Sequence, residues 1–216
     1  MLDLTNKPII LQLCADTGSD TKPYQDDPNY EVILVGESIG VENYHPPKGV
    51  VGIIANPVCT HFSQVRRGKP GDNYMHTSDH QEGMKLVNEC LRIIDEAMPM
   101  WWVIENPATG QLHKYLGKPQ AVYKPWQFGS PWGKKTALWG KFNMPPILYK
   151  KWEDVPNKIP ELWLRGERKI PSLAYQHKSA YKFIPEFATL PTPHSDMEFR
   201  SMCSQQFAKQ FKEVNP

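Results

Sequence analysis

The side chains best suited to chemistry in this sequence are the thiol of Cys59 and the carboxyl group of Glu105. Cys59 follows the apolar run 49–57, and Glu105 lies near the end of the apolar run 100–107; both runs stop at an Asn-Pro pair. A thiolate is a nucleophile, and covalent catalysis on a ring usually needs an acid partner. The pair therefore indicates nucleophilic catalysis on a ring. Taken alone, Cys59 is equally consistent with a bystander thiol.

Short apolar runs and one amphipathic segment would position these two groups. The runs are rich in Val and Ile without strict alternation, which predicts strands buried on both faces; they cover 8–14, 30–36, 49–57 and 100–107. Between the last two runs, apolar residues recur at spacings of three and four from Met84 to Met98, which predicts a helix that Pro99 ends. The succession of strand, helix and strand predicts a parallel crossover in an open α/β sheet.

Parallel neighbouring strands end at the same edge of a sheet, and ligands bind outside that edge. Cys59 and Glu105 are therefore expected to face one crevice. The long polar segment 58–77 could act as a flap over it. Farther on, 123–147 could hold two short strands, 148–196 shows no clear periodicity, and 204–214 predicts a final helix.

Composition fits one domain of a cytoplasmic protein. The chain has 216 residues, 40% of them apolar, with neither a secretory signal nor an apolar run of membrane-spanning length. Its cysteines are far apart and form no CxxC pair, which predicts neither a disulfide framework nor a zinc knuckle; they are Cys14, Cys59, Cys90 and Cys203. His76 and His80 lie four apart, but without a third ligand nearby we favour helix capping or solvated side chains over a metal site.

Charge is distributed unevenly along the chain. Residues 111–182 hold fourteen Lys or Arg against four Asp or Glu, whereas the rest holds eleven against nineteen. Such asymmetry predicts a polyanion partner, with a solvated basic face as the alternative. The clustered cations that could hold phosphates are Lys150, Lys151, Arg165, Arg168 and Lys169. Three tryptophans beside basic residues, Trp132, Trp152 and Trp163, could stack on bases, although core packing is the default for each.

Two segments resemble motifs of the DNA cytosine carbon-5 methyltransferase family. "ANPVCTHFS" (55–63) is similar to its proline-cysteine motif GGPPCQxFS, and "VIENP" (103–107) to its Glu-Asn-Val motif. The matching residues are Pro57, Cys59, Phe62, Ser63, Glu105 and Asn106. In the family's chemistry, Cys59 would add to ring carbon-6 of cytosine, Glu105 would hold the ring nitrogen and exocyclic amine, and Asn106 and Ser63 would orient the loop and the acid.

Two further segments extend the resemblance in the right order. "LQLCADTGS" (11–19) is similar to the cofactor motif DLFAGxGS, and "FGSPWGKKTALWG" (128–140) to the Gly-x-Pro-Gln-x-Arg-x-Arg motif, with Lys134 and Lys135 near the usual arginines. Lys135, with Lys134, would hold the ring carbonyl or a nearby phosphate. The cofactor implied is S-adenosylmethionine; its expected contacts are Leu13, Ala15, Asp16, Gly18, Ser19, Glu37, Asn43 and Pro57. Glu37 reads equally well as a solvent-facing loop carboxylate.

The resemblance implies a class I S-adenosylmethionine-dependent methyltransferase fold, a mostly parallel open sheet with helices on both faces. It is nearest to short, phage-type proteins of DNA modification, because the basic, proline-rich segment 141–196 stands in place of a target-recognition domain within a single domain 1–216. The expected partner is duplex or single-stranded DNA, with no membrane and no metal. The alternatives are a degenerate, non-catalytic protein that binds nucleic acid or a protein, and an enzyme acting on a free pyrimidine nucleotide.

Overall fold

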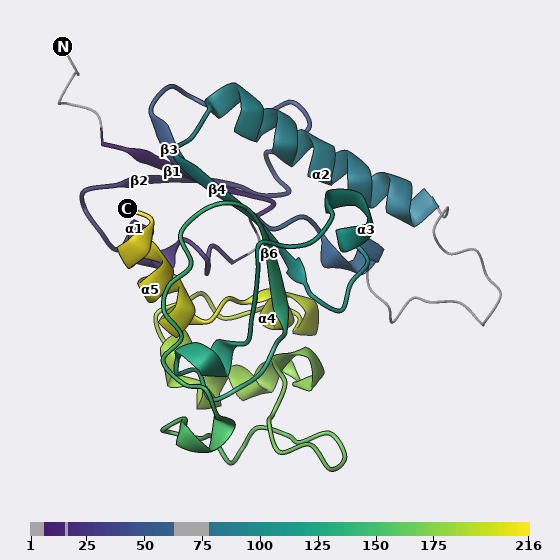
Figure 1. Cartoon of the computed structure of the whole chain (residues 1–216), viewed down its shortest axis with the longest axis vertical. Coiled ribbons are helices and arrows are strands. Elements are labelled where there is room, and N and C mark those ends of the chain that lie inside the picture. Colours follow the sequence, from purple (N-terminus) through teal and green to yellow (C-terminus); the bar gives the residue numbers. More distant parts are fainter. Residues whose placement is uncertain (1–6, 16, 63–77) are drawn as a thin grey trace. The chain divides into compact units, whose positions relative to one another are not determined.

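The computed structural model describes residues 7–15, 17–62 and 78–216 (Figure 1). They group into two compact units. The first unit holds 7–15, 27–62, 78–122 and 136–142, and the second unit holds 17–26, 123–135 and 143–216. The expected flap falls mostly on 63–77, outside the described residues, and Asp16, Ser63 and His76 lie outside them as well.

The described strands form one six-stranded sheet in the order β2-β1-β3-β4-β6-β5. The strands are β1 (Ile9–Leu13), β2 (Glu31–Val35), β3 (Val50–Ala55), β4 (Trp101–Pro107), β5 (Ala121–Tyr123) and β6 (Thr136–Lys141). β1 pairs in parallel with β2 and β3, β3 pairs in parallel with β4, and β6 runs antiparallel to β4. The predicted α/β class and mostly parallel sheet are confirmed, and the two short strands expected within 123–147 correspond roughly to β5 and β6.

Burial follows the position of each strand in the sheet. β1 is buried at every position and β3 at all but one, as expected for central parallel strands. The same expectation is wrong for β2, where Glu31 and Leu34 are exposed. β2 is an edge strand, so only one neighbouring strand and fewer side chains cover it.

Helix α2 (Ser78–Ala97) supplies the apolar face that packs on this sheet. Val87, Cys90 and Ile93 are fully buried in one cluster with residues of β1, β3 and β4, and Figure 1 shows α2 running alongside those strands. The predicted helix is therefore confirmed. The predicted apolar stripe reaches one residue too far, because Met98 lies beyond the helix with a φ of 46° and is 83% exposed.

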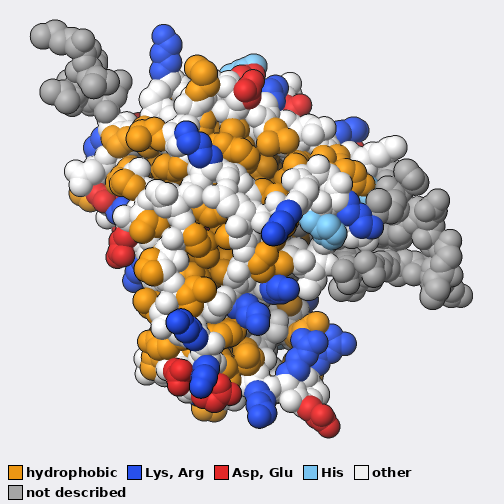
Figure 2. Space-filling model, in the orientation of Figure 1, with side chains coloured by type: hydrophobic (Ala, Val, Ile, Leu, Met, Phe, Trp, Pro, Cys, Tyr) orange, Lys and Arg blue, Asp and Glu red, His pale blue; other side chains and the backbone are white. Residues whose placement is uncertain are grey.

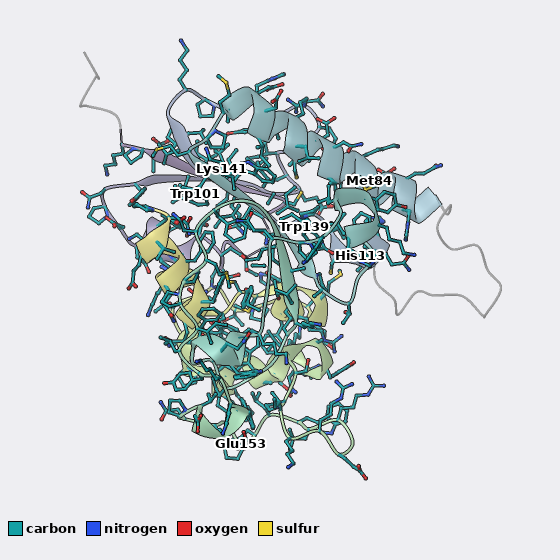
Figure 3. The ribbon with its side chains drawn as sticks, in the orientation of Figure 1. Met84, Trp101, His113, Trp139, Lys141 and Glu153 are labelled. Atoms are coloured by element: carbon teal, nitrogen blue, oxygen red, sulfur yellow. The ribbon has the colours of Figure 1, made fainter. Side chains whose placement is uncertain are left out.

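One close approach within the sheet requires glycine. Gly52 on β3 pairs with Trp101 on β4, a residue labelled in Figure 3, and a Cβ at Gly52 would lie 2.1 Å from the indole ring. The ring can lie flat against β3 only because position 52 lacks a side chain.

The second unit has little regular structure. Its helices are α1 (Lys22–Gln25), α4 (Asp196–Ser201) and α5 (Gln205–Val214), joined by single 3₁₀ turns; these are η4 (Pro125–Phe128), η5 (Trp152–Asp154), η6 (Leu173–Tyr175), η7 (Lys178–Phe183) and η8 (Pro185–Phe187). A separate core holds Trp132, Phe187 and Phe199. The predicted final helix is confirmed as α5, whose N-cap Ser204 accepts a hydrogen bond from the Phe207 amide.

No helix in the described part of the chain combines the length and hydrophobicity needed to cross a bilayer.

Candidate active site

Cys59 begins a short 3₁₀ turn, η1 (Cys59–Phe62), three residues after β3 ends. All four cysteines are free, and Cys59 is the exposed one, whereas Cys90 and Cys203 are buried and Cys14 is half-buried. The Cys14 and Cys90 sulfur atoms lie 3.8 Å apart. The hydrogen bond with Cys14, together with burial, raises the pKa of Cys90, which keeps that thiol protonated. Exposure therefore singles out Cys59 for reaction with a substrate.

Glu105 leaves the sheet at the same edge as Cys59. β3 and β4 are parallel, with Ala55 paired to Ile104, so the chain continues from that pair toward Cys59 on one strand and into Glu105 on the other. The side chain of Glu105 is half-buried. The structure thus brings the thiol-bearing turn and the carboxylate to one carboxyl edge, as the parallel order predicts.

Asn106 holds the chain just before the thiol. Its Nδ2 donates a hydrogen bond of 2.8 Å to the carbonyl oxygen of Pro57, and both residues are buried. Neighbouring residues of a strand point to opposite faces, so Asn106 and Glu105 project to opposite sides of β4. Asn106 therefore positions the Cys59 turn, and its neighbour Glu105 is left to act elsewhere at the edge.

Phe62 holds the other end of the same turn. Its side chain is fully buried, and its carbonyl oxygen accepts a hydrogen bond of 2.9 Å from the Gln111 amide. Its ring centroid lies 5.8 Å from that of His80 and 6.1 Å from that of Tyr115. His80 is buried, with Nδ1 2.9 Å from the Tyr115 hydroxyl, so the expectation of a capping or solvated side chain is wrong. The turn is anchored on both sides of its exposed thiol.

Buried polar atoms without a hydrogen-bond partner in the described structure gather near this turn. They are Asn106 Oδ1, Gln111 Oε1 and His61 Nδ1. A Cβ at Gly110 would lie 3.7 Å from that Asn106 atom and 3.3 Å from the Phe62 carbonyl oxygen, so the loop after β4 packs closely here. His113, labelled in Figure 3 on α3 (His113–Leu116), has its Nδ1 3.0 Å from the Gly110 carbonyl oxygen. Unsatisfied buried polar groups are rare and concentrate at functional sites.

Gly83 of α2 lets the helix approach the Cys59 turn, and alanine there should disturb it. A Cβ at position 83 would lie 2.6 Å from His61 Cβ and 2.9 Å from Phe62 Cζ. We expect Gly83→Ala to lower the free energy of unfolding by about 1–3 kcal/mol through overpacking, despite a gain in helix propensity of about 1 kcal/mol. Thermal unfolding and the alkylation rate of Cys59 measure both effects. Asn88→Ala, on the exposed side of α2, is the control, and unchanged values for Gly83→Ala would contradict the packing described.

Asn106 can be tested as a positioning residue. We expect Asn106→Ala to destabilise the fold by about 1–3 kcal/mol, because the buried Pro57 carbonyl loses its donor. Asn106→Asp should be worse at neutral pH than at acid pH, since only a protonated carboxyl group can donate to that carbonyl. The measurement is urea unfolding of both variants at pH 5 and pH 7.5, together with Cys59 alkylation. Equal behaviour of the aspartate variant at both pH values would argue against this hydrogen bond.

The predicted cofactor residues of the first unit lie at the ends of β1, β2 and β3. Leu13 is fully buried in the core, and Ala15 follows it, donating its amide to the Val35 carbonyl at 3.2 Å. At Gly36 a Cβ would lie 2.7 Å from the Ala15 carbonyl oxygen. Glu37 is exposed directly after this contact, and Asn43 is exposed as well. An exposed carboxylate beyond the second strand fits the hydroxyls of a nucleotide ribose.

Gly18 and Ser19 belong to the second unit. Gly18 has a φ of 66°, in the left-handed region that glycine adopts readily, and its carbonyl accepts from Gln25 Nε2 at 2.8 Å. Ser19 is fully buried, its hydroxyl accepts from the Cys203 amide at 2.9 Å, and its carbonyl accepts from Gln205 Nε2 at 2.8 Å. These bonds tie 18–19 to the start of α5, and the cofactor role of both residues stays a prediction.

The predicted phosphate-binding residues also lie in the second unit. Lys134 donates to the Ser201 carbonyl at 3.5 Å, and Lys135 is exposed. The remaining cations are all exposed; they are Lys150, Lys151, Arg165, Arg168 and Lys169. Of the three tryptophans, Trp132 is buried in the core, Trp152 is half-buried, and Trp163 is 56% exposed.

Sequence reasoning missed Glu186, whose carboxylate organises the second unit. Its Oε2 accepts from Ser130 Oγ at 2.8 Å and from the amides of Gln205 and Gln206 at 2.9 and 3.2 Å. Its Oε1 accepts from Trp132 Nε1 at 2.8 Å. Glu186 thus joins the "GSPWGKK" segment to the N-terminus of α5, where helix amides attract a negative charge. A lone Glu between Pro185 and Phe187 gave no sequence signal of this role.

A hollow of about 280 Å³ lies elsewhere in the first unit. It is bounded by α2, α3, β4 and β6, with Leu91, Trp102 and Trp139 in its wall, and its lining includes neither Cys59 nor Glu105. The expected crevice at the sheet edge therefore rests on strand order and not on this hollow.

Comparisons with known proteins point to one class of enzyme. No protein-family model matches the chain. The "probable DNA (cytosine-5)-methyltransferase" of Frog virus 3 (isolate Goorha) is 29% identical over 92 residues, which are 39% of this chain and 43% of that protein. A crystal structure of a prophage-encoded DNA modification methyltransferase from E. coli gives a TM-score of 0.43 at 14% identity, covering 62% of this chain and 47% of that one. The chain therefore spans less than half of that viral relative, and over 92 residues it is similar to a DNA (cytosine-5)-methyltransferase.

Proposed function

We propose that the chain is an S-adenosylmethionine-dependent methyltransferase that modifies carbon-5 of cytosine in DNA through a covalent adduct at Cys59. The observation that carries the proposal is the exposed thiol on a turn anchored at both ends, at the sheet edge where Glu105 also emerges. The similarity to the Frog virus 3 protein supports the same class of reaction.

Cytosine carbon-5 is a poor nucleophile, and the thiolate changes that. In the proposed reaction the Cys59 sulfur bonds to ring carbon-6, which breaks the double bond between carbons 5 and 6 and makes carbon-5 nucleophilic. Carbon-5 takes the methyl group, then loses its own proton to a base such as water. The double bond re-forms as the bond from sulfur to carbon-6 breaks, and the Cys59 thiolate is restored.

Other residues of the chain stabilise the charge that develops on the ring. Glu105 holds the ring nitrogen and the exocyclic amine, and Lys135, with Lys134, holds the ring carbonyl or a neighbouring phosphate. Asn106 keeps the turn in place through the Pro57 carbonyl. In duplex DNA the target base must leave the stack to reach the thiol.

The ends of β1 and β2 fit the cofactor of this reaction. S-adenosylmethionine would supply the methyl group as an electrophile on a sulfonium. The tight contact of Gly36 with Ala15 leaves room for no side chain there, and the exposed Glu37 is placed to accept from ribose hydroxyls. Asn43 would face the adenine in this proposal.

The test is methyl transfer with analysis of the product. The protein is incubated with tritiated S-adenosylmethionine and unmethylated duplex DNA, single-stranded DNA or dCMP, and the nucleosides are separated. Label in 5-methyldeoxycytidine, together with covalent trapping by DNA containing 5-fluorocytosine, supports the proposal. Label on adenine, label on dCMP alone, or no transfer to any substrate would refute it.

A further inference from the structure

We propose that the loop 162–169 binds single-stranded DNA, with Trp163 stacking on an unpaired base and Arg165 and Arg168 contacting the neighbouring phosphates. This inference deepens the proposed function, on which it rests, because it names the form of DNA that the second unit engages. The loop belongs to the basic segment 111–182.

Trp163 is an exposed aromatic side chain in a loop that is otherwise well fixed. Its side chain is 56% exposed and that of Leu164 is 45% exposed, whereas Leu162 is buried in the core of the second unit. Tryptophan buries a large area when it meets a partner, so leaving it in solvent is costly. An indole held out beside a buried anchor is suited to contact with a partner.

Gln176 fixes the backbone from which the indole projects. Its Oε1 accepts from the Trp163 amide at 2.9 Å, and its Nε2 donates to the Trp163 carbonyl at 2.8 Å. Gln176 is itself buried, and its carbonyl accepts from Arg200 Nε at 3.0 Å. A side-chain amide that satisfies both backbone groups of one residue holds that residue much as a neighbouring strand would. Little conformational entropy is then lost when Trp163 binds, which favours affinity.

Two guanidinium groups lie against a second aromatic ring beside this loop. The central carbons of Arg165 and Arg168 lie 4.4 Å and 5.2 Å from the centroid of the Tyr175 ring. Lys169 is exposed beside them, and the exposed acids of the same stretch are Glu161 and Glu167. Figure 2 shows a group of Lys and Arg side chains where Figure 1 draws this green loop. Tyr175 orders the two cations while their outer nitrogens stay available to phosphate oxygens.

The chemistry favours a single strand over an intact duplex. In a duplex both faces of an internal base are covered by its neighbours, so an indole has no face on which to stack. In a single strand the bases present those faces, and aromatic side chains between cations recognise them with little regard to sequence. The repeated phosphates of the strand match the paired guanidinium groups, which a neutral apolar partner would not.

Binding of fluorescein-labelled oligonucleotides, measured by anisotropy without cofactor, tests the inference. The wild-type protein should bind a single strand more tightly than the matched duplex, and a duplex with a central bulged base should fall between them. Trp163→Ala should weaken single-strand binding by about 5- to 150-fold, whereas Trp163→Phe should retain most of it while losing the quenching of tryptophan fluorescence. Arg165→Gln with Arg168→Gln should lower the slope of log Kd against log salt by about 0.7 for each phosphate that the variant no longer binds.

Lys209→Gln is the matched control for charge, because Lys209 is an exposed cation on α5 outside the loop. Circular dichroism and thermal unfolding establish that each variant folds. Equal binding by Trp163→Ala and wild type, or tighter binding to the duplex, would overturn the inference. Cys59→Ala should bind the single strand as wild type does. Loop-dependent binding without any methyl transfer would refute the proposed function and leave this inference standing, and the reverse result would do the opposite.

Discussion

Cys59→Ala is expected to lower methyl transfer to cytosine by at least about 10³-fold, because no other group in the proposed reaction can activate carbon-5. Cys59→Ser should be almost as inactive, since a hydroxyl is a far weaker nucleophile than a thiolate. The measurement is transfer of tritium from S-adenosylmethionine to DNA under single-turnover conditions. Neither variant should form a covalent complex with DNA containing 5-fluorocytosine.

The structure supplies the control for this experiment. Cys203 is buried in the second unit, so Cys203→Ser removes one thiol and keeps Cys59. That variant should transfer methyl groups at close to the wild-type rate once its folding is verified. Retention of more than a tenth of the activity by Cys59→Ala, with normal DNA binding, would show that the chemistry does not pass through this sulfur.

The strands of the first unit were predictable because each is a short apolar run bounded by turn residues. Such runs need cover on both faces, and β1 and β3 obtain it in the middle of the sheet. The exposure of β2 was not predictable, because an apolar run does not reveal that its strand lies at an edge. The reversed direction of β6 likewise depends on pairing with β4, a strand far from it in sequence.

The edge that carries Cys59 and Glu105 was predictable, but the contacts that hold it were not. Parallel order alone sends both residues to one edge. The bond between Asn106 and the Pro57 carbonyl joins residues 49 positions apart, and the bond between Glu186 and Ser130 joins residues 56 apart. Local patterns report periodicity and turn chemistry, and they carry no information about such distant partners.

Positioning and reactivity are divided between neighbouring residues in this architecture. A flexible loop would let the thiol sample many directions, and ordering it during reaction would cost free energy. Asn106 and Phe62 remove that freedom before the substrate arrives, because each fixes one side of a turn of four residues. The thiol itself stays exposed. Variants of the anchors should therefore alter the alkylation rate of Cys59 even where no DNA is present.

Glu186→Ala is expected to lower the free energy of unfolding by about 3–5 kcal/mol, because four donors lose one carboxylate acceptor. Glu186→Gln should cost about 1–3 kcal/mol, since an amide has one acceptor oxygen and must turn its N–H toward either Trp132 or the N-terminus of α5. Urea unfolding followed by circular dichroism measures both. The exposed neighbour Ala188, as Ala188→Ser, is a control that should change stability little.

The pH dependence of this loss gives a sharper test of the same carboxylate. Burial raises the pKa of Glu186 above its usual value, although the hydrogen bonds from Ser130, Trp132 and the α5 amides oppose that effect. The folded state therefore binds the proton more tightly than the unfolded state does. The stability that protonated Glu186 contributes is complete below the ordinary pKa of glutamate and is lost as the pH rises through the folded-state pKa. The stability of wild type relative to Glu186→Gln should thus fall with rising pH across that window, and a difference that is constant or grows would contradict a raised pKa.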